Sequence, residues 1–282
     1  MTLVVRRIAI AGDLHGLWDT QDHELLERLN PDGILFVGDL SEGDIGLLKL
    51  IVKIPIPIFV ILGNHDRGKD GTGDLLKTQL NILGEKHCCW GLGKWGISDI
   101  SVLGARPCSS GGGYFLSREV KGAFGDISLE ESARLIALGA SQAPLGNPLI
   151  ILSHSGPTGL GSESYSPCGR DWKKPPIDWG DKDLSIAIDR IREIRVPDLV
   201  VFGHTHHQLS RNQGNRITFT KDLWGTCYLN VACVPRKGIN SLGHNLSHFS
   251  WVEFDSKHLI HISHRWYLSD GTLAYEEVLL KK

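Results

Sequence analysis

Five short polar motifs in the chain carry side chains that bind metal ions or move protons. In chain order they are Gly12-Asp13-Leu14-His15, Gly38-Asp39, Gly63-Asn64-His65-Asp66, Ser153-His154 and Gly203-His204-Thr205-His206. Carboxylate, amide and imidazole groups without thiolates suit manganese, iron or zinc. Their number exceeds what one tetrahedral ion can use. The motifs therefore favour two metal ions that share a carboxylate. A single Asp or His could instead be a helix cap, but five such motifs in succession are hard to explain that way.

Each motif directly follows a short apolar run that is rich in Ile, Val and Leu. The runs cover residues 7–11, 33–37, 56–62, 148–152 and 199–202. Near-continuous apolar runs of this length are typical of strands covered on both faces. Because functional side chains gather at the carboxyl ends of the strands in open α/β sheets, we expect the motifs to meet there. The glycines allow the backbone to turn sharply at these points.

Helical patterns separate the apolar runs, at residues 21–29, 44–52, 128–138 and 181–194. The third pattern opens with Ser128 and Glu131 in the spacing of a capping box. The alternation of strands and helices predicts an α/β fold with a largely parallel central portion. Residues 226–234, 248–254, 258–264 and 272–279 are β-rich and predict a second, more antiparallel sheet. We expect residues 1–282 to form a single domain.

The composition excludes several classes of protein. The chain has 282 residues, of which 41% are hydrophobic, and its formal net charge is −2. Nucleic acid is therefore not expected as the main partner. The N-terminal apolar stretch is too short for a signal peptide, and no run is long enough to predict a membrane span. The six cysteines show no zinc-binding spacing, which predicts reduced thiols in a cytoplasmic protein.

The five motifs, in this order, resemble those of the calcineurin-like metallophosphoesterase superfamily. The resemblance spans Gly12 to His206 and is closest to the small bacterial and plastid members. It implies a four-layer sandwich of two mixed β-sheets flanked by α-helices. The position three residues after Asp39 is Glu42, whereas the purple acid phosphatases have tyrosine there. The Asp-Arg pair of the serine/threonine protein phosphatases is also missing.

The resemblance implies a role for each motif residue. Asp13, His15 and His206 would hold the first ion, and Asn64, His154 and His204 the second. Asp39 would bridge the two ions. His65 would be the catalytic residue that stabilises the phosphoryl oxygens or protonates the leaving group. Asp66 beside it would orient His65, or else form a turn or cap.

A phosphomonoester or phosphodiester of small size is the implied substrate. Two divalent or trivalent transition-metal ions, manganese first and iron or zinc as alternatives, would activate a bridging water for attack on phosphorus. A nuclease of the same superfamily, a lipid-precursor pyrophosphatase and a non-catalytic interaction scaffold on the same fold remain alternatives. The oligomeric state stays open.

Two loop segments could contact the substrate. Arg106 precedes a serine- and glycine-rich stretch and could present its guanidinium group to a phosphate, although an ordinary solvated loop is the alternative. Residues 155–183 are rich in proline and glycine and are expected to form a loop or lid over the site. Within them, Trp172 and Trp179 could stack on a base or pack the loop down, and packing is the expected role.

Overall fold

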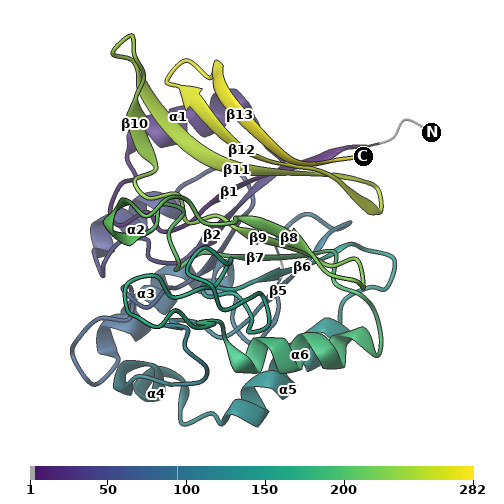
Figure 1. The fold of residues 1–282 in the computed structure, drawn as a ribbon. Coiled ribbons are helices and arrows are strands. Elements are labelled where there is room, and N and C mark those ends of the chain that lie inside the picture. The colour runs from purple at the N-terminus through teal and green to yellow at the C-terminus, as the bar shows by residue number, and fades with distance from the viewer. Residues whose placement is uncertain (1–3, 94) are drawn as a thin grey trace.

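The computed structural model describes residues 4–93 and 95–282, which form two stacked β-sheets with helices on the outside (Figure 1). The first sheet has seven strands and begins with three parallel ones, β1 (Arg6–Ala11), β2 (Gly33–Val37) and β3 (Ile58–Ile61). Antiparallel strands from the end of the chain extend it beyond β1. They are β11 (Asn245–Asp255), β12 (His258–Leu268), β13 (Leu273–Lys281) and the short β10 (Lys237–Ile239), which pairs with β11.

The second sheet has six strands in the order β4-β5-β6-β7-β9-β8. Its four central strands are parallel: β5 (Ser101–Gly104), β6 (Leu149–Leu152), β7 (Leu199–Phe202) and β9 (Cys227–Asn230). Antiparallel strands close its two edges, β4 (Gly91–Leu92) and β8 (Phe219–Lys221).

The two sheets bury one hydrophobic layer between them. Ile8 and Val37 from the first sheet belong to the same buried cluster as Ile150 and Val201 from the second. Alternate residues of each strand point outward, so Ala9 packs in the other buried cluster, together with residues of the helices. Strands covered on both faces explain why the sequence shows continuous apolar runs rather than alternation.

Six α-helices within the described residues cover the outer faces. They are α1 (Thr20–Leu29), α2 (Ile45–Ile51), α3 (Asp74–Leu83), α4 (Arg118–Phe124), α5 (Leu129–Ser141) and α6 (Lys182–Arg192), with 3-10 turns at Gly84–Lys86 and Ser210–Asn212. Helices α5 and α6 lie side by side below the six-stranded sheet in Figure 1. Helix α5 begins as predicted, because Ser128 accepts a hydrogen bond from the backbone N–H of Glu131 at 3.1 Å. In the described part of the chain, no helix is both long and apolar enough to cross a membrane.

The predicted fold class is confirmed, and all five apolar runs are strands. The expectation that the C-terminal β-rich segments form a second, more antiparallel sheet is wrong. Strand β9 instead lies parallel to β7 in the six-stranded sheet, and β10–β13 extend the seven-stranded one. The reason is that β11 pairs with β1, where Ile8 lies opposite Val252 and both side chains enter the layer between the sheets. The prediction also missed the helices α3 and α4 and the strands β4, β5, β8 and β10.

Candidate metal centre

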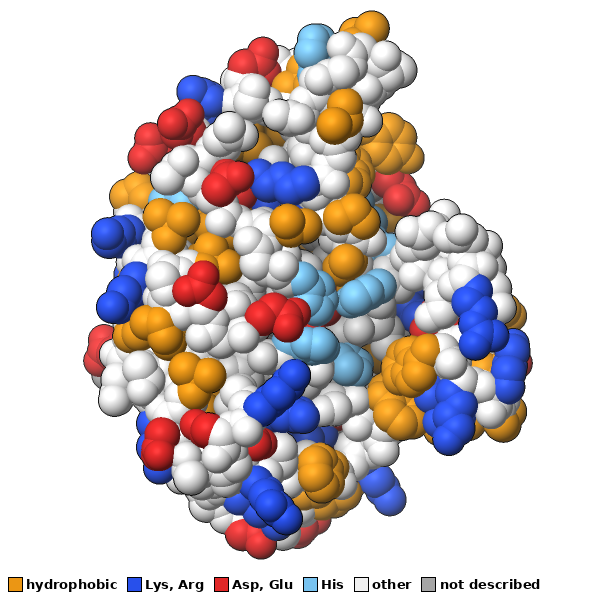
Figure 2. Space-filling model, turned by 90° about the vertical axis from the view of Figure 1, so that its left-hand side faces the viewer, with side chains coloured by type: hydrophobic (Ala, Val, Ile, Leu, Met, Phe, Trp, Pro, Cys, Tyr) orange, Lys and Arg blue, Asp and Glu red, His pale blue; other side chains and the backbone are white. Residues whose placement is uncertain are grey.

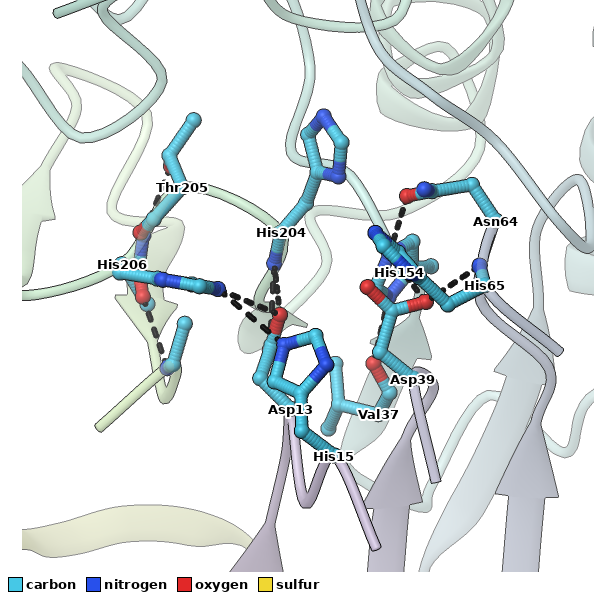
Figure 3. Close-up of polar contacts among 12 residues, drawn as sticks. Asp13, His15, Val37, Asp39, Asn64, His65, His154, His204, Thr205 and His206 are labelled. Carbon is cyan, nitrogen blue, oxygen red and sulfur yellow. Dashed lines mark hydrogen bonds and ion pairs between the residues drawn. The ribbon is translucent and has the colours of Figure 1, made fainter. Parts of the chain in front are cut away.

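All seven predicted ligands converge at the carboxyl ends of strands from both sheets (Figure 3). The first sheet contributes the residues that follow β1, β2 and β3, and the second contributes those that follow β6 and β7. In chain order the converging side chains are Asp13, His15, Asp39, Asn64, His154, His204 and His206. The site therefore lies where two sheet edges meet, rather than along the edge of one sheet.

The first group of donor atoms consists of Asp13, His15 and His206. One atom from each residue lies within 4.8 Å of the other two. The Nε2 atoms of His15 and His206 are 3.3 Å apart, and His206 Nε2 is 3.7 Å from Asp13 Oδ1. Two imidazole nitrogens and a carboxylate oxygen that face one point form a donor set suited to a transition-metal ion.

The second group consists of Asp39, His154 and His204, whose donor atoms also lie within 4.8 Å of one another. Asn64 joins this group, because its Oδ1 is 3.1 Å from His154 Nε2. His204 Nε2 is buried and has no hydrogen-bond partner among residues 4–93 and 95–282. A buried ring nitrogen without a partner is costly unless an ion accepts its lone pair, so these residues fit a metal ion.

The ionisation of the buried groups at the site is coupled to the binding of a cation. Burial raises the pKa of Asp13 to about 8, and the neighbouring Asp39 carboxylate contributes in the same direction. Burial also lowers the pKa of His204 to about 3, so its imidazole is neutral at pH 7, which is the form that binds metals. A cation near the buried carboxylates would offset the cost of ionising them together.

The backbone around the candidate ligands is strained. Asp13, His15, Asp39 and His204 all have positive φ angles, of 50°, 45°, 48° and 67°. Such conformations are uncommon outside glycine and cluster at functional sites. The glycine before His204 is required for a different reason, because a Cβ at Gly203 would lie 2.1 Å from Asp13 Oδ2. The side chain of one ligand therefore occupies the space beside the turn that carries another.

Glu42 is a residue of the site that sequence reasoning missed. Its Oε1 is 2.7 Å from His15 Nδ1, and its Oε2 is 3.3 Å from His65 Nδ1. The hydrogen bond to His15 is the main reason why the pKa of Glu42 lies below its usual value. The available signal was an acidic residue on the turn three positions after Asp39. One carboxylate thus contacts both a candidate ligand and the candidate catalytic histidine.

Asp66 has a different environment from the expected one. Its carboxylate is fully buried and accepts hydrogen bonds from the backbone N–H groups of Leu40, Ser41 and Gly63 at 2.9–3.1 Å. In the part of the chain that the structure describes, no hydrogen bond joins it to His65. Asp66 fastens the turn after β2 to the turn after β3, which is the cap-like role that the sequence left open. It is a positioning residue rather than a catalytic one.

The expectation that Arg106 binds substrate is also corrected. The side chain is only 2% exposed. Its Nη2 lies 2.6 Å from Asp181 Oδ1, and its Nε lies 3.0 Å from Asp183 Oδ2. Nη1 donates to the carbonyl oxygen of Phe115 at 2.8 Å. Each nitrogen of the guanidinium group is engaged within the fold, so Arg106 joins its loop to the start of α6.

The two tryptophans of residues 155–183 differ. Trp179 packs as expected, and its Nε1 donates to the carbonyl oxygen of Ser110 at 2.8 Å. Trp172 is 46% exposed and lies beside His204. Residues 155–183 border the metal-binding groups at this point.

The sequence profile described as calcineurin-like phosphoesterase matches residues 6–208. The fold is similar to that of a dimetal phosphatase from Danio rerio, with 10% identity, a TM-score of 0.54, and coverage of 98% of this chain and 99% of that one. It is also similar to GAP50, described as the anchor in the inner membrane complex of Plasmodium, with 13% identity, a TM-score of 0.52, and coverage of 99% and 89%. None of the curated protein sequences compared with the chain matches it significantly. Since the profile matches most of the chain, this protein belongs to the calcineurin-like phosphoesterase family.

Proposed function

We propose that the chain is a dinuclear metal-dependent phosphoesterase that hydrolyses a small phosphomonoester or phosphodiester. The observation that supports this most strongly is the convergence of six of the donors in two adjacent groups, with Asn64 beside His154 in the second group. Manganese is the expected metal, with iron and zinc as alternatives, because the donor set has no thiolate. The cytoplasm is the proposed location.

The two groups divide the ligands between two ions. Asp13, His15 and His206 would hold one ion, and Asn64, His154 and His204 the other, with Asp39 shared between them. When bound, the ions supply positive charge to the phosphate oxygens and lower the pKa of a water molecule. The chain's own part is to fix the ligands. For example, His204 donates its backbone N–H to Asp13 Oδ1 at 3.0 Å, which ties a ligand of one group to a ligand of the other.

His65 is the proposed proton donor. Its side chain is 49% exposed, so a substrate can reach it, and its backbone N–H donates to Asp39 Oδ1 at 2.8 Å. Because Nδ1 faces Glu42, Nε2 is the atom that can donate a proton to the leaving oxygen or a hydrogen bond to the phosphoryl group. The contact with Asp39 keeps His65 close to the ligands without making it one.

A non-catalytic scaffold is the principal alternative, since the similar GAP50 is described as an anchor and a fold alone does not decide function. A nuclease is the second alternative, and the net charge of −2 does not favour it.

A metal titration and a substrate screen together test the proposal. Protein reconstituted with excess manganese should bind about two ions per chain and hydrolyse at least one ester among monoesters, diesters, cyclic nucleotides and nucleoside diphosphate conjugates. Protein that binds no metal ion and hydrolyses none of these would support the scaffold. Preference for long single- or double-stranded DNA over small esters would support the nuclease.

A further inference from the structure

Trp172 is an exposed aromatic side chain at the border of the metal centre. Trp172 is 46% exposed to solvent. Its ring centroid is 6.5 Å from that of His204, and the two ring planes meet at 86°. A large aromatic side chain that remains this exposed beside a buried polar site is available to a ligand.

The ring of Trp172 rests on a well-packed neighbour. Its centroid lies 5.5 Å from that of Trp179 in an edge-to-face arrangement. Trp179 is itself fixed by its hydrogen bond to the carbonyl oxygen of Ser110 and by the guanidinium group of Arg170, which lies 5.1 Å from the ring centroid. The exposed ring therefore has a firm support within the fold.

Arg216 connects the residue before Trp172 to the metal centre. The arginine is 5% exposed, and its Nη2 lies 3.1 Å from Asp171 Oδ1. Its Nε donates to the carbonyl oxygen of His206 at 2.9 Å, while Nη1 donates to the carbonyl oxygens of Ser166 and Gly169. One buried side chain thus fixes the 164–171 segment against the backbone of a candidate ligand. These contacts hold the backbone that precedes Trp172 against the metal site before substrate binds, which lowers the ordering cost of binding.

The charge beside Trp172 is positive. Lys173 and Lys174 follow it directly, and both are exposed. Figure 2 shows histidine side chains gathered on this face, with hydrophobic and basic side chains on a projecting part of the surface across a hollow from them. An aromatic ring with basic neighbours suits a ligand that combines a planar ring with negative charge.

We propose that Trp172 determines substrate specificity by stacking on the base of a nucleotide whose phosphate ester is hydrolysed at the metal centre. This inference rests on the proposed function. In a nucleotide the sugar separates the base from the phosphate, so the base can lie on Trp172 while the phosphate lies at the donor groups that include the neighbouring His204. Stacking of a base on an aromatic side chain contributes about 1–3 kcal/mol, which corresponds to about 5- to 150-fold in affinity.

The test compares three substrates in four proteins. The substrates are adenosine 5′-monophosphate, glucose 1-phosphate and glycerol 3-phosphate, and the proteins are the wild type, Trp172→Ala, Trp172→Phe and Trp224→Ala. Trp224 is the matched control because it is 65% exposed but precedes the amino end of β9, at the opposite end of the sheet from the ligands. Trp172→Ala should lower the ratio of kcat/KM for the nucleotide to that for glycerol 3-phosphate by about 5- to 150-fold. Trp172→Phe should restore most of this ratio, and Trp224→Ala should not change it.

The possible results separate the two proposals. Three results for Trp172→Ala would overturn the stacking role and leave the hydrolase standing. They are an equal loss of kcat/KM for all three esters, an equal loss of kcat/KM for glucose 1-phosphate and the nucleotide, and an unchanged ratio of kcat/KM. If the wild type hydrolyses none of these three monoesters, the wider ester screen decides whether the proposed function stands. Calorimetry of adenosine 5′-monophosphate binding to manganese-loaded protein then still tests Trp172, since the alanine variant should bind about 5- to 150-fold more weakly. Unchanged binding would overturn the inference.

Discussion

The imidazole of His154 donates from Nδ1 to the carbonyl oxygen of Val37 at 2.8 Å and so joins the two β-sheets at the metal centre. His154 follows β6 of the six-stranded sheet, whereas Val37 ends β2 of the seven-stranded one. This bond fixes the orientation of the ring. It directs Nε2 toward the carboxylate of Asp39, whose Oδ1 lies 3.4 Å away.

Metal affinity should rise with pH. Although burial lowers the pKa of His154, the adjacent Asp39 carboxylate raises it to about 10 in the metal-free chain. The imidazole is then protonated at pH 7, and an ion can bind only by displacing that proton. Apparent affinity for manganese should increase up to tenfold per pH unit for this proton. Calorimetric titration at pH 6, 7 and 8 measures the slope. In His154→Gln this slope should correspond to about one fewer proton released per ion bound. A wild-type affinity that does not change with pH would contradict this account.

Asp39→Asn should impair the site more than loss of a terminal ligand. If Asp39 is shared by both ions, the neutral amide weakens the binding of both ions, whereas His206→Ala weakens the binding of one. We expect manganese content and turnover to fall further in Asp39→Asn than in His206→Ala, measured by elemental analysis and by hydrolysis of the best substrate of the screen. An Asp39→Asn protein with two ions and a near-normal rate would disprove the bridging role.

His65→Ala should separate chemistry from metal binding. We expect both ions to stay bound while kcat falls by about 10²–10⁴-fold, the usual contribution of a general acid. The loss should shrink for p-nitrophenyl phosphate, because nitrophenolate leaves with little protonation. Parallel rate and metal measurements distinguish the outcomes. Loss of metal would make His65 a ligand or structural residue, and an equal loss for good and poor leaving groups would leave only electrostatic stabilisation.

Glu42→Gln should lower activity through the two histidines that it contacts. The amide keeps the size of the side chain but has a single acceptor oxygen, so it cannot serve both His15 and His65 as the carboxylate does. Hydrogen bonds from a neighbouring residue to a metal ligand typically contribute about 10–100-fold to metal affinity or activity. Steady-state kinetics and manganese titration measure the effect. Glu27→Gln removes the same charge from the exposed side of α1 and should have wild-type values. Identical values for the two variants would exclude a role for Glu42.

Arg106→Ala should destabilise the fold rather than weaken substrate binding. It leaves the buried carboxylates of Asp181 and Asp183 without their cation, and such a change typically costs about 3–5 kcal/mol. Urea unfolding measures this difference. Arg106→Lys keeps the charge and should lose less of the free energy of unfolding than Arg106→Ala. This variant can still be measured if the alanine variant does not fold. A raised KM with an unchanged unfolding midpoint would restore Arg106 as a substrate contact.

The sequence by itself determined the five strands that precede the polar motifs and the residues that follow them. Apolar runs and the polar motifs after them are local patterns, and strands buried on both faces must be apolar along their whole length. The motif residues could therefore be predicted from their types and spacing, and the order of the motifs identified the family. The β-rich segment 226–234 shows the limit of this approach. Its composition predicts a strand, but nothing local says whether that strand joins β7 or β11.

Only the tertiary structure decided which side chains from distant parts of the chain meet. Three examples show this. Glu42 contacts His65, Arg106 is buried between two aspartates, and the exposed Trp172 lies beside His204. Arg106 and Trp172 both lie on loops rich in glycine or proline, and composition alone did not show that the first side chain is buried and the second exposed. Whether an arginine or a tryptophan is buried or open depends on which partners the packed elements bring to it. These partners depend on the whole fold, because burying a charge or a donor is costly unless other parts of the fold satisfy it.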